Sequence, residues 1–244
     1  MSEQQAVTKM FDGISPHYDF LNHLLSFGID KRWRKKTSLL TSRCHPFTIL
    51  DVATGTADLA LRMAHDNPEA TVTGLDLSEK MLEIGKQKIN KKQLGHRVKL
   101  QQGDAAQMPF NDNTFDVVTS AFGVRNFEHL EQGLHEMARV TKDQGMIAVL
   151  EFSHPQKGFL KIPYRWYSKH ILPLVGRTVS RHPQAYHYLP SSIEDFPDGA
   201  AFAMLLEKAG LTEVKARRFS GGIATLYFGK IQKNTSTSHN KKTQ

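Results

Sequence analysis

The sequence predicts an α/β protein in which a mostly parallel sheet carries helices on both faces. Apolar strand-like segments alternate with amphipathic helical segments, and an acidic residue ends each of the first three strands. The clearest unit, 48–60, contains an apolar strand ending in Asp51, a turn of small residues around Gly55, and a helix start. Gly55 can adopt backbone angles closed to other residues and lets the main chain approach a ligand at the helix N-terminus. The unit is therefore typical of a nucleotide-binding fold.

The next two strands also end in acids. About 20 residues after Gly55, the apolar segment 71–76 ends at Asp76, which is placed to accept both hydroxyls of an adenosine ribose. The segment 97–102 runs into Asp104, whose carboxylate can accept a hydrogen bond from the adenine amino group. The pattern predicts an adenosine site.

The turn after the first strand distinguishes between adenosine cofactors. NAD requires Gly-x-Gly-x-x-Gly, because its pyrophosphate lies against three backbone positions, whereas this chain has only Gly55 in that register. S-adenosylmethionine carries no phosphate, and Asp51 suits its charged methionine end. We therefore predict a Rossmann-like class I methyltransferase that binds S-adenosylmethionine.

The remaining elements complete the expected sheet. We expect strands at 115–120 and 146–152 with a helix at 128–140 between them, then a helix at 199–210 and two strands at 213–219 and 223–230. The last two strands form the antiparallel end of a seven-stranded methyltransferase sheet. A single domain is expected over 1–231.

Three segments lie outside this alternation. Residues 1–45 have helical apolar spacing and are expected to form an N-terminal cap over the cleft. Residues 157–190, rich in aromatic and basic side chains, are too long for a plain linker and are expected to form a lid after the fifth strand. The polar segment 232–244 is expected to be a disordered tail.

Composition limits the partners. The chain has 244 residues, a formal net charge of +8 and a pI near 9.5, which suggests nucleic acid or an anionic membrane surface as a partner. The positive charge is concentrated in Lys31–Lys36 and in 157–187. Cys44 is the only cysteine, so an intrachain disulfide is excluded, and we expect no metal site. No apolar run approaches the roughly 18 residues of a membrane helix, and the N-terminus lacks a signal-peptide pattern, so we expect a cytoplasmic protein.

Residues after the fourth strand usually contact the methyl acceptor, because that strand end faces the cofactor across the cleft. Here Ala121–Asn126 lack the Asn or Asp, paired prolines and aromatic residue of enzymes that methylate exocyclic base amines. Cys44 precedes the first strand and is poorly placed as the nucleophile that carbon methylation of a pyrimidine requires. We therefore expect no nucleic-acid partner.

Motifs spread over residues 11–228 resemble the quinone-biosynthesis C-methyltransferases, the family of demethylmenaquinone and methoxy-polyprenyl-benzoquinol methyltransferases. The matching motifs are Tyr18-Asp19-x-x-Asn22, Leu25-Ser26-Phe27-Gly28-Ile29, Leu50-Asp51 through Asp58, Pro109-Phe110-x-Asp112-Asn113-Thr114-Phe115-Asp116, Phe122-Gly123-Val124-Arg125-Asn126, Glu151-Phe152-Ser153-x-Pro155 and Tyr186-x-Tyr188-Leu189-x-x-Ser192-Ile193. The resemblance implies cofactor contacts at Thr56, Asp76, Asp104 and Ala105. There are two departures: Thr54-Gly55-Thr56-Ala57 replaces the usual Gly-Gly-Thr-Gly, and Ala121 stands where relatives often have serine.

The resemblance also implies a reaction, the transfer of a methyl group from S-adenosylmethionine to a ring carbon of a prenylated quinol. Demethylmenaquinol is the expected acceptor, with benzoquinol methylation in ubiquinone biosynthesis as the alternative. A deprotonated quinol hydroxyl pushes electron density onto the neighbouring carbon, so we expect Arg125 to stabilise the quinolate and Asn126 to orient the ring oxygen. The expected substrate wall comprises Tyr18, Asn22, Tyr164, Tyr186 and Tyr188.

The isoprenoid tail of such a substrate resides in lipid. We therefore expect the cluster around Trp33 and the basic, aromatic lid to dock peripherally on the inner face of an anionic membrane. A homodimer is compatible with the sequence. Two other classes stay open: an RNA-binding methyltransferase, whose RNA affinity would fall steeply with salt, and a noncatalytic adenosine-binding protein, which would turn over no quinol.

Overall fold

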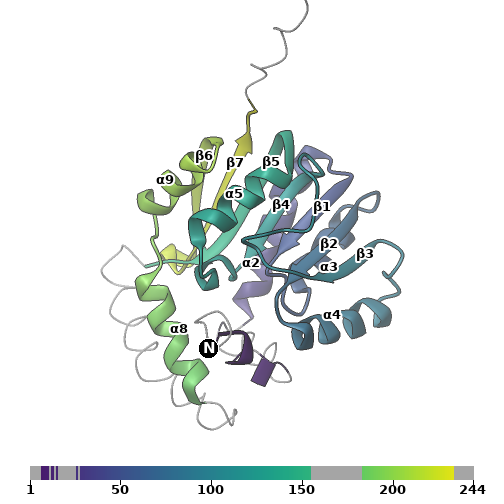
Figure 1. The fold of residues 1–244 in the computed structure, drawn as a ribbon, viewed down its shortest axis with the longest axis horizontal. Coiled ribbons are helices and arrows are strands. Elements are labelled where there is room, and N and C mark those ends of the chain that lie inside the picture. The colour runs from purple at the N-terminus through teal and green to yellow at the C-terminus, as the bar shows by residue number, and fades with distance from the viewer. Residues whose placement is uncertain are drawn as a thin grey trace, which may run out of the picture.

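The computed structural model describes residues 7–10, 12–13, 15, 26, 28–154 and 183–233. Its centre is a seven-stranded sheet with the order β3-β2-β1-β4-β5-β7-β6 (Figure 1). The strands are β1 (Thr48–Val52), β2 (Thr71–Asp76), β3 (Val98–Gln102), β4 (Phe115–Ala121), β5 (Thr141–Phe152), β6 (Leu211–Phe219) and β7 (Ala224–Ile231). Strands β1 to β5 pair in parallel, and β7 pairs antiparallel with β5 and β6. The predicted mostly parallel sheet with an antiparallel end is confirmed.

The strand order reverses between β1 and β4. The chain places β2 and β3 on one side of β1 and then returns to place β4 on the other side. Ligands of open α/β sheets bind outside the carboxyl ends of the strands at such a reversal. The sequence of β1 suits this central position, because Ile49, Leu50 and Val52 are each 0% exposed and need cover on both faces.

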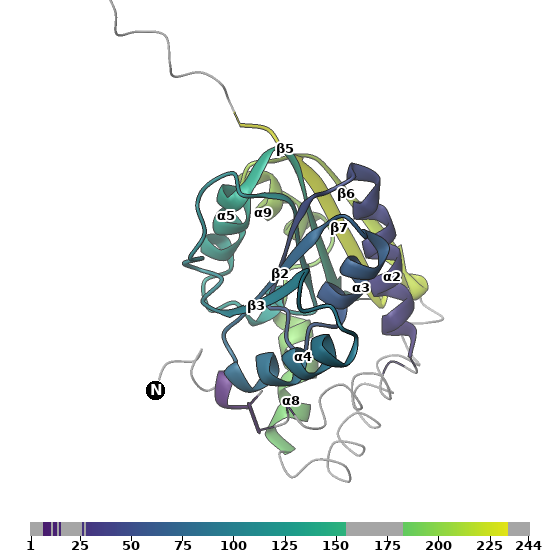
Figure 2. The ribbon, with the colours of Figure 1, turned by 90° about the vertical axis from the view of Figure 1, so that its right-hand side faces the viewer.

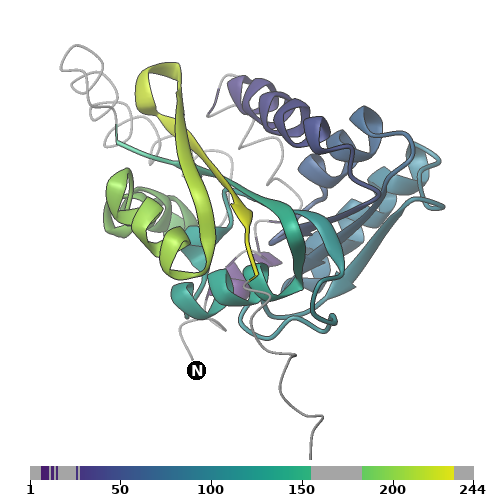
Figure 3. The same ribbon diagram turned by 90° about the horizontal axis from the view of Figure 1, so that it is seen from above.

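Helices cover both faces of the sheet (Figure 2). On one face lie α5 (Leu130–Val140) and α9 (Ala200–Lys208), and on the other lie α2 (Ile29–Thr41) and α3 (Asp58–Asp66). Figure 3 shows the same layers from above, with β6 and β7 running between α9 and α2. Helix α4 (Glu79–Lys91) shares a buried cluster with α3, in which Ile89 packs near Val98 of β3. The predicted helices on both faces are confirmed.

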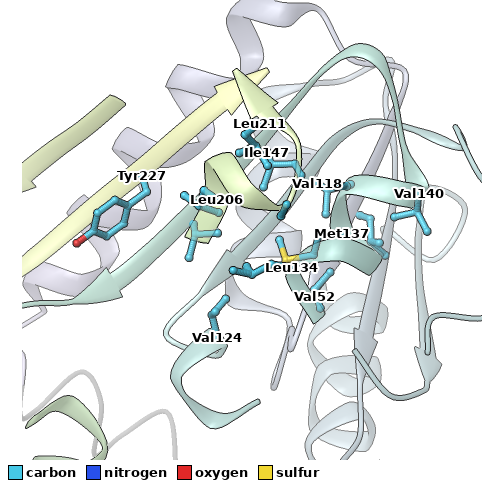
Figure 4. Close-up of a cluster of buried hydrophobic side chains, with 14 of the residues drawn as sticks. Val52, Val118, Val124, Leu134, Met137, Val140, Ile147, Leu206, Leu211 and Tyr227 are labelled. Atoms are coloured by element: carbon cyan, nitrogen blue, oxygen red, sulfur yellow. The ribbon is translucent and has the colours of Figure 1, made fainter. Parts of the chain in front are cut away.

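The largest buried cluster lies between the sheet and the α5–α9 layer (Figure 4). Leu134 and Met137 of α5 and Leu206 of α9 are at most 1% exposed. They pack in one cluster with Val118 of β4 and Tyr227 of β7. Since each large apolar side chain contributes about 1.5–3 kcal/mol when fully buried, this cluster fixes the helix α5 whose N-terminal end borders the site.

The largest boundary difference from the sequence prediction is at β5, which begins at Thr141 instead of 146. Thr141 is fully buried, pairs with Phe115 and donates from Oγ1 to the carbonyl oxygen of Met137 at 2.7 Å. The register then shifts along β4 between Phe115 and Val117. The start of β5 at Thr141 was not predicted, because the polar residues 142–145 that follow it lack the apolar pattern of a buried strand.

The predicted cap, lid and tail fall only partly within the described residues. Helix α2 lies inside the expected cap of 1–45, and α8 (Pro183–Asp195) contains the end of the expected lid. The rest of the lid and most of the tail at 232–244 lie outside the described residues. No helix in the described part of the chain is both long and apolar enough to cross a membrane.

Candidate active site

A cavity lies at the carboxyl ends of β1 to β4, where the strand reversal predicts a ligand site. We call it the larger cavity. Loops that follow the four strands supply most of its wall, and the N-terminal segment adds Val7 and Thr8. The loop residues that line it include Ala53, Gly55, 76–78, 103–106, 122–123 and 126–129.

Backbone N–H groups hold Asp76 at this cavity. Its Oδ2 accepts from the amide of Gly55 at 2.7 Å, and its Oδ1 accepts from the amide of Ser78 at 2.9 Å. Burial raises the pKa of Asp76, while these N–H groups act in the opposite direction. A carboxylate has about four lone-pair sites, so Asp76 can hold the turn and accept ligand hydroxyls at the same time.

Asp104 and Ala105 lie on the wall formed by the loop after β3. Asp104 Oδ1 accepts from the amide of Ala106 at 2.8 Å, which shapes this loop. Gly103 lets the loop lie close to β2, because a Cβ at this position would be 2.7 Å from Leu75 Cδ1. The structure therefore brings Asp76 and Asp104 to one cavity, as the strand ends predicted.

The turn after β1 separates the larger cavity from a second, smaller cavity. Ala53 and Gly55 line both. Gly55 has a φ of 55°, and Ala53 and Ala57 have φ values of 52° and 67°, a region that costs an L residue roughly 1–2 kcal/mol. Ala57 is one of two residues that replace usual family glycines, the other being Thr54, and it is the one that falls on a left-handed backbone position.

Asp51 lies at the smaller cavity rather than among the residues of the larger one. It is 1% exposed and accepts hydrogen bonds from Thr54 Oγ1 at 2.7 Å and Thr119 Oγ1 at 3.0 Å. Burial raises the pKa of Asp51 to about 6, and the two threonines and the charge of Arg34 act in the opposite direction.

Thr56 also lines the smaller cavity. Its Oγ1 accepts from Lys88 Nζ at 2.9 Å, and the same ammonium pairs with Asp58 at 2.7 Å. Lys88 of α4 thereby ties the turn to a neighbouring helix. The predicted cofactor residues are thus divided between two cavities that share Gly55.

The loop after β4 presents Asn126 to the larger cavity. Tyr188 Oη of α8 donates to Asn126 Oδ1 at 3.0 Å. The short helix η2 (Val124–Asn126) provides this placement, and Phe122 before it has a φ of 62°. Two residues predicted to contact substrate, Asn126 and Tyr188, are therefore brought together from segments far apart in the sequence.

Arg125 lies differently from the expected fixed cation facing a substrate ring. Its Nη1 donates to Glu151 Oε1 at 2.8 Å and to the carbonyl oxygen of Phe122. The two side chains of the pair are 5% and 0% exposed, and Arg125 is not among the residues that line the larger cavity. Its Nε is buried and has no hydrogen-bond partner among the residues that the structure describes. The guanidinium therefore ties the loop after β4, which we call the acceptor loop, to β5.

The other predicted substrate residues are not placed. Tyr18, Asn22 and Tyr164 lie outside the described residues, and the side chain of Tyr186, within α8, is also outside them. Conversely, sequence reasoning missed Glu128 and His129, which line the larger cavity directly after the acceptor loop. Their position two and three residues after Asn126 is the signal that could have identified them.

The basic cluster Lys31–Lys36, which we expected to take part in membrane docking, is only partly exposed. Lys31, Arg32, Lys35 and Lys36 are exposed. Trp33 and Arg34 are 4% and 9% exposed, because the helical period turns them toward the sheet. Trp33 Nε1 donates to Ser220 Oγ at 3.1 Å, so the expectation that Trp33 takes part in membrane docking is wrong.

Among the residues that the structure describes, no group of three or more His, Cys, Asp or Glu side chains could hold a metal ion. Cys44 is exposed in η1 (Ser42–Cys44), which precedes β1. It therefore lies near the amino end of β1, whereas both cavities lie at the carboxyl end.

Comparison with known proteins identifies the family of this chain. The model of the ubiE/COQ5 methyltransferase family matches residues 1–231. A demethylmenaquinone methyltransferase of Porphyromonas gingivalis is 42% identical over 228 residues, covering 93% of each chain. One from Bacteroides fragilis is 40% identical over 92% of each chain. The ubiquinone/menaquinone biosynthesis C-methyltransferase UbiE of Geotalea uraniireducens is 41% identical, over 92% of this chain and 96% of the relative.

Solved structures share the fold at low sequence identity. The [4+2]-cyclase SpnF superposes with a TM-score of 0.69 at 18% identity, covering 95% of this chain and 96% of that one. A SAM-dependent methyltransferase from Thermotoga maritima gives 0.61 at 16% identity, covering 92% and 99%. The predicted class I methyltransferase fold is thereby confirmed.

Proposed function

Because the chain belongs to the ubiE/COQ5 methyltransferase family, we propose that it transfers a methyl group from S-adenosylmethionine to a ring carbon of a prenylated quinol. Demethylmenaquinol is the proposed acceptor. Relatives at 40% and 42% identity over more than nine-tenths of the chain are demethylmenaquinone methyltransferases, which supports this choice over a benzoquinol.

The residues of the larger cavity fit the adenosine part of S-adenosylmethionine. Asp76 offers carboxylate oxygens for the ribose hydroxyls, and Asp104 offers them for the adenine amino group. Leu77, Met81 and Phe127, which also line this cavity, supply apolar surface for the flat base. When bound, the cofactor supplies a methyl group on a sulfonium, from which the neutral thioether is a good leaving group. The observation that carries the proposal is this pairing of two acids from neighbouring strand ends in one cavity.

Asn126 is the proposed contact to the quinol ring. The hydrogen bond from Tyr188 fixes the carbonyl side of its amide, so its NH2 group is the part left to donate to a ring oxygen. Such a contact would favour the deprotonated, electron-rich ring over the neutral one, because an anionic oxygen accepts the stronger hydrogen bond. Tyr188 is then a positioning residue.

Arg125 is proposed to act mainly through position. Its bond to Glu151 and to the Phe122 carbonyl fixes both ends of the loop that carries Asn126. Loss of this pair would release the loop, even without direct contact between Arg125 and the ring. The role of a fixed cation for the quinolate remains the competing proposal, and the two roles are separable by experiment.

Methyl transfer from labelled S-adenosylmethionine to each reduced acceptor tests the function. We expect turnover of reduced demethylmenaquinone and little turnover of its oxidised form, because the quinone has no hydroxyl proton to lose and an electron-poor ring. Faster methylation of a methoxy-polyprenyl-benzoquinol would reassign the acceptor. Absence of transfer to either quinol, with intact cofactor binding, would leave a noncatalytic adenosine-binding protein.

We also propose peripheral contact with an anionic membrane through the four exposed cations of α2. These residues, which we call the α2 basic face, are Lys31, Arg32, Lys35 and Lys36. Each exposed cation near such a surface contributes about 1 kcal/mol. A prenylated acceptor resides in lipid, so even weak attraction would bring the cavity to its substrate.

A further inference from the structure

The smaller cavity holds an arginine that the adenosine site does not use. Arg34 lines this cavity together with Asp51, Asp58 and the turn residues 53–56. The larger cavity accounts for ribose and adenine, but S-adenosylmethionine also ends in an α-amino acid with one carboxylate and one ammonium. A site for that end needs a cation and an anion next to the adenosine site, and the smaller cavity contains both.

Arg34 is held rigidly in this position. Its side chain is 11% exposed and pairs with Asp30 one helical turn earlier, and its guanidinium lies 5.1 Å from the centre of the Phe122 ring. Trp33 anchors the same helical turn, through the hydrogen bond to Ser220 and ring contacts with Phe122 at 6.1 Å and Phe152 at 6.4 Å. A flat guanidinium carries five N–H donors, so the pair with Asp30 leaves donors for a second carboxylate.

Arg34 and Asp51 also interact across the cavity, since the charge of Arg34 lowers the pKa of the buried Asp51 carboxyl. A zwitterion bound between Arg34 and Asp51 would place each of its charges beside a group of opposite charge. We propose that Arg34 binds the α-carboxylate of S-adenosylmethionine in the smaller cavity, while Asp51 takes the ammonium. This proposal rests on the proposed function, because it assumes the cofactor.

In the alternative, Arg34 has only a structural role within its own helix. Its guanidinium would then serve only to hold Asp30, whose Oδ1 accepts from Ser26 Oγ at 2.6 Å. The two roles differ in what they predict for ligands. A carboxylate-binding arginine discriminates between ligands with and without a carboxylate. A structural arginine affects all adenosine ligands equally.

Calorimetric binding of three ligands tests the proposal: S-adenosylmethionine, its decarboxylated analogue, and 5′-methylthioadenosine, which lacks the whole amino-acid end. For Arg34→Gln we expect a roughly 10- to 100-fold loss of S-adenosylmethionine affinity, the range of one or two charged hydrogen bonds. The affinities for the other two ligands should stay within about threefold of the unchanged protein. Arg43→Gln, which changes an exposed arginine just after the same helix, is the matched control and should change none of the three.

Asp30→Asn keeps Arg34 but removes its partner charge, and should leave the preference for the carboxylated ligand intact. Equal losses for all three ligands in Arg34→Gln, reproduced by Asp30→Asn, would overturn the proposal in favour of the structural role. An unchanged S-adenosylmethionine affinity in Arg34→Gln would also overturn it. Failure of the unchanged protein to bind S-adenosylmethionine at all would instead overturn the proposed function.

Discussion

Replacement of Arg125 separates a positioning role from a catalytic one. Arg125→Met keeps an unbranched stem beside Phe152, whose ring centre lies 5.4 Å from the guanidinium carbon, but removes the charge. Glu151 would then remain 0% exposed without its cationic partner. Breaking a buried pair in this way costs about 3–5 kcal/mol. For a domain of this size, about 2–4 °C per kcal/mol gives a fall in melting temperature of roughly 6–20 °C.

The double variant Arg125→Met/Glu151→Gln removes both charges and should recover most of that stability. It also loses one of the two carboxylate oxygens that accept from the amides of Arg125 and Phe152, so we expect a residual cost of about 1 kcal/mol. Arg62→Met is the control, because it breaks a pair with Asp66 in which the arginine is 30% exposed. There the cost should be smaller than for Arg125→Met, because the guanidinium is already partly in water and Asp66 keeps a hydrogen bond from Ser38 Oγ.

Thermal melting and single-turnover methyl transfer are measured on the same samples. If Arg125 acts by holding the acceptor loop, the double variant regains both stability and a rate within about tenfold of the unchanged enzyme. If stability returns while the rate stays about 100- to 1,000-fold low, the loss is that of a group that stabilises charge in the transition state. That second result would refute the positioning argument and restore Arg125 as the cation that faces the quinolate.

Four other outcomes follow from the geometry. Asp76→Ala should weaken S-adenosylmethionine binding at least about 100-fold in calorimetry, because two charge-assisted hydrogen bonds at roughly 1.5–3 kcal/mol each are lost; unchanged affinity would remove Asp76 from the ribose site. The folded-state pKa of Asp51, about 6 against 3.8 for the free group, means that this residue alone should contribute a fall in stability of about 3 kcal/mol as pH rises from about 4 to 6. Asp51→Asn should abolish that fall in pH-dependent melting, and an identical pH profile would contradict it. Tyr188→Phe should lower kcat by roughly 3- to 10-fold, the value of one hydrogen bond, with unchanged cofactor affinity; an effect on cofactor affinity alone would place Tyr188 elsewhere. Neutralising the α2 basic face should reduce co-sedimentation with anionic vesicles, with a loss of about 1 kcal/mol of binding free energy per charge. The loss should be larger than that from neutralising the exposed cations of the α4 region, which are Lys80, Lys86, Lys91 and Lys92. Equal losses would mean diffuse attraction without a docking face.

The sequence predicted those parts of the molecule that depend on local pattern. The strand ends at Asp76 and Asp104 were located by an apolar run followed by an acid, and parallel pairing then requires them to meet at one edge. Asn126 was located by its place after the fourth strand, whereas Tyr188 was identified only through resemblance to a family. No local pattern links these two residues, which lie 62 positions apart.

Other features of the site depend on packing that no short pattern encodes. The partner of Arg125 is Glu151, 26 residues later on a buried strand, where a run of apolar neighbours gives no sign of an ion pair. Arg34 was concealed within a basic run, and only the helical period, set by the buried Trp33, shows which of its charges turns inward.

The position of β7 has a consequence for biosynthesis. The last strand that the structure describes lies inside the sheet, between β5 and β6, so neither neighbour has its full set of backbone partners until residues 224–231 have been made. Until then β5, whose residues 147–150 are at most 1% exposed in the finished sheet, presents an open apolar edge. A truncated chain that ends before β7 would therefore be prone to aggregation and would not be a slightly shorter enzyme. Completion of the fold becomes, in effect, a check that translation reached the end of the domain.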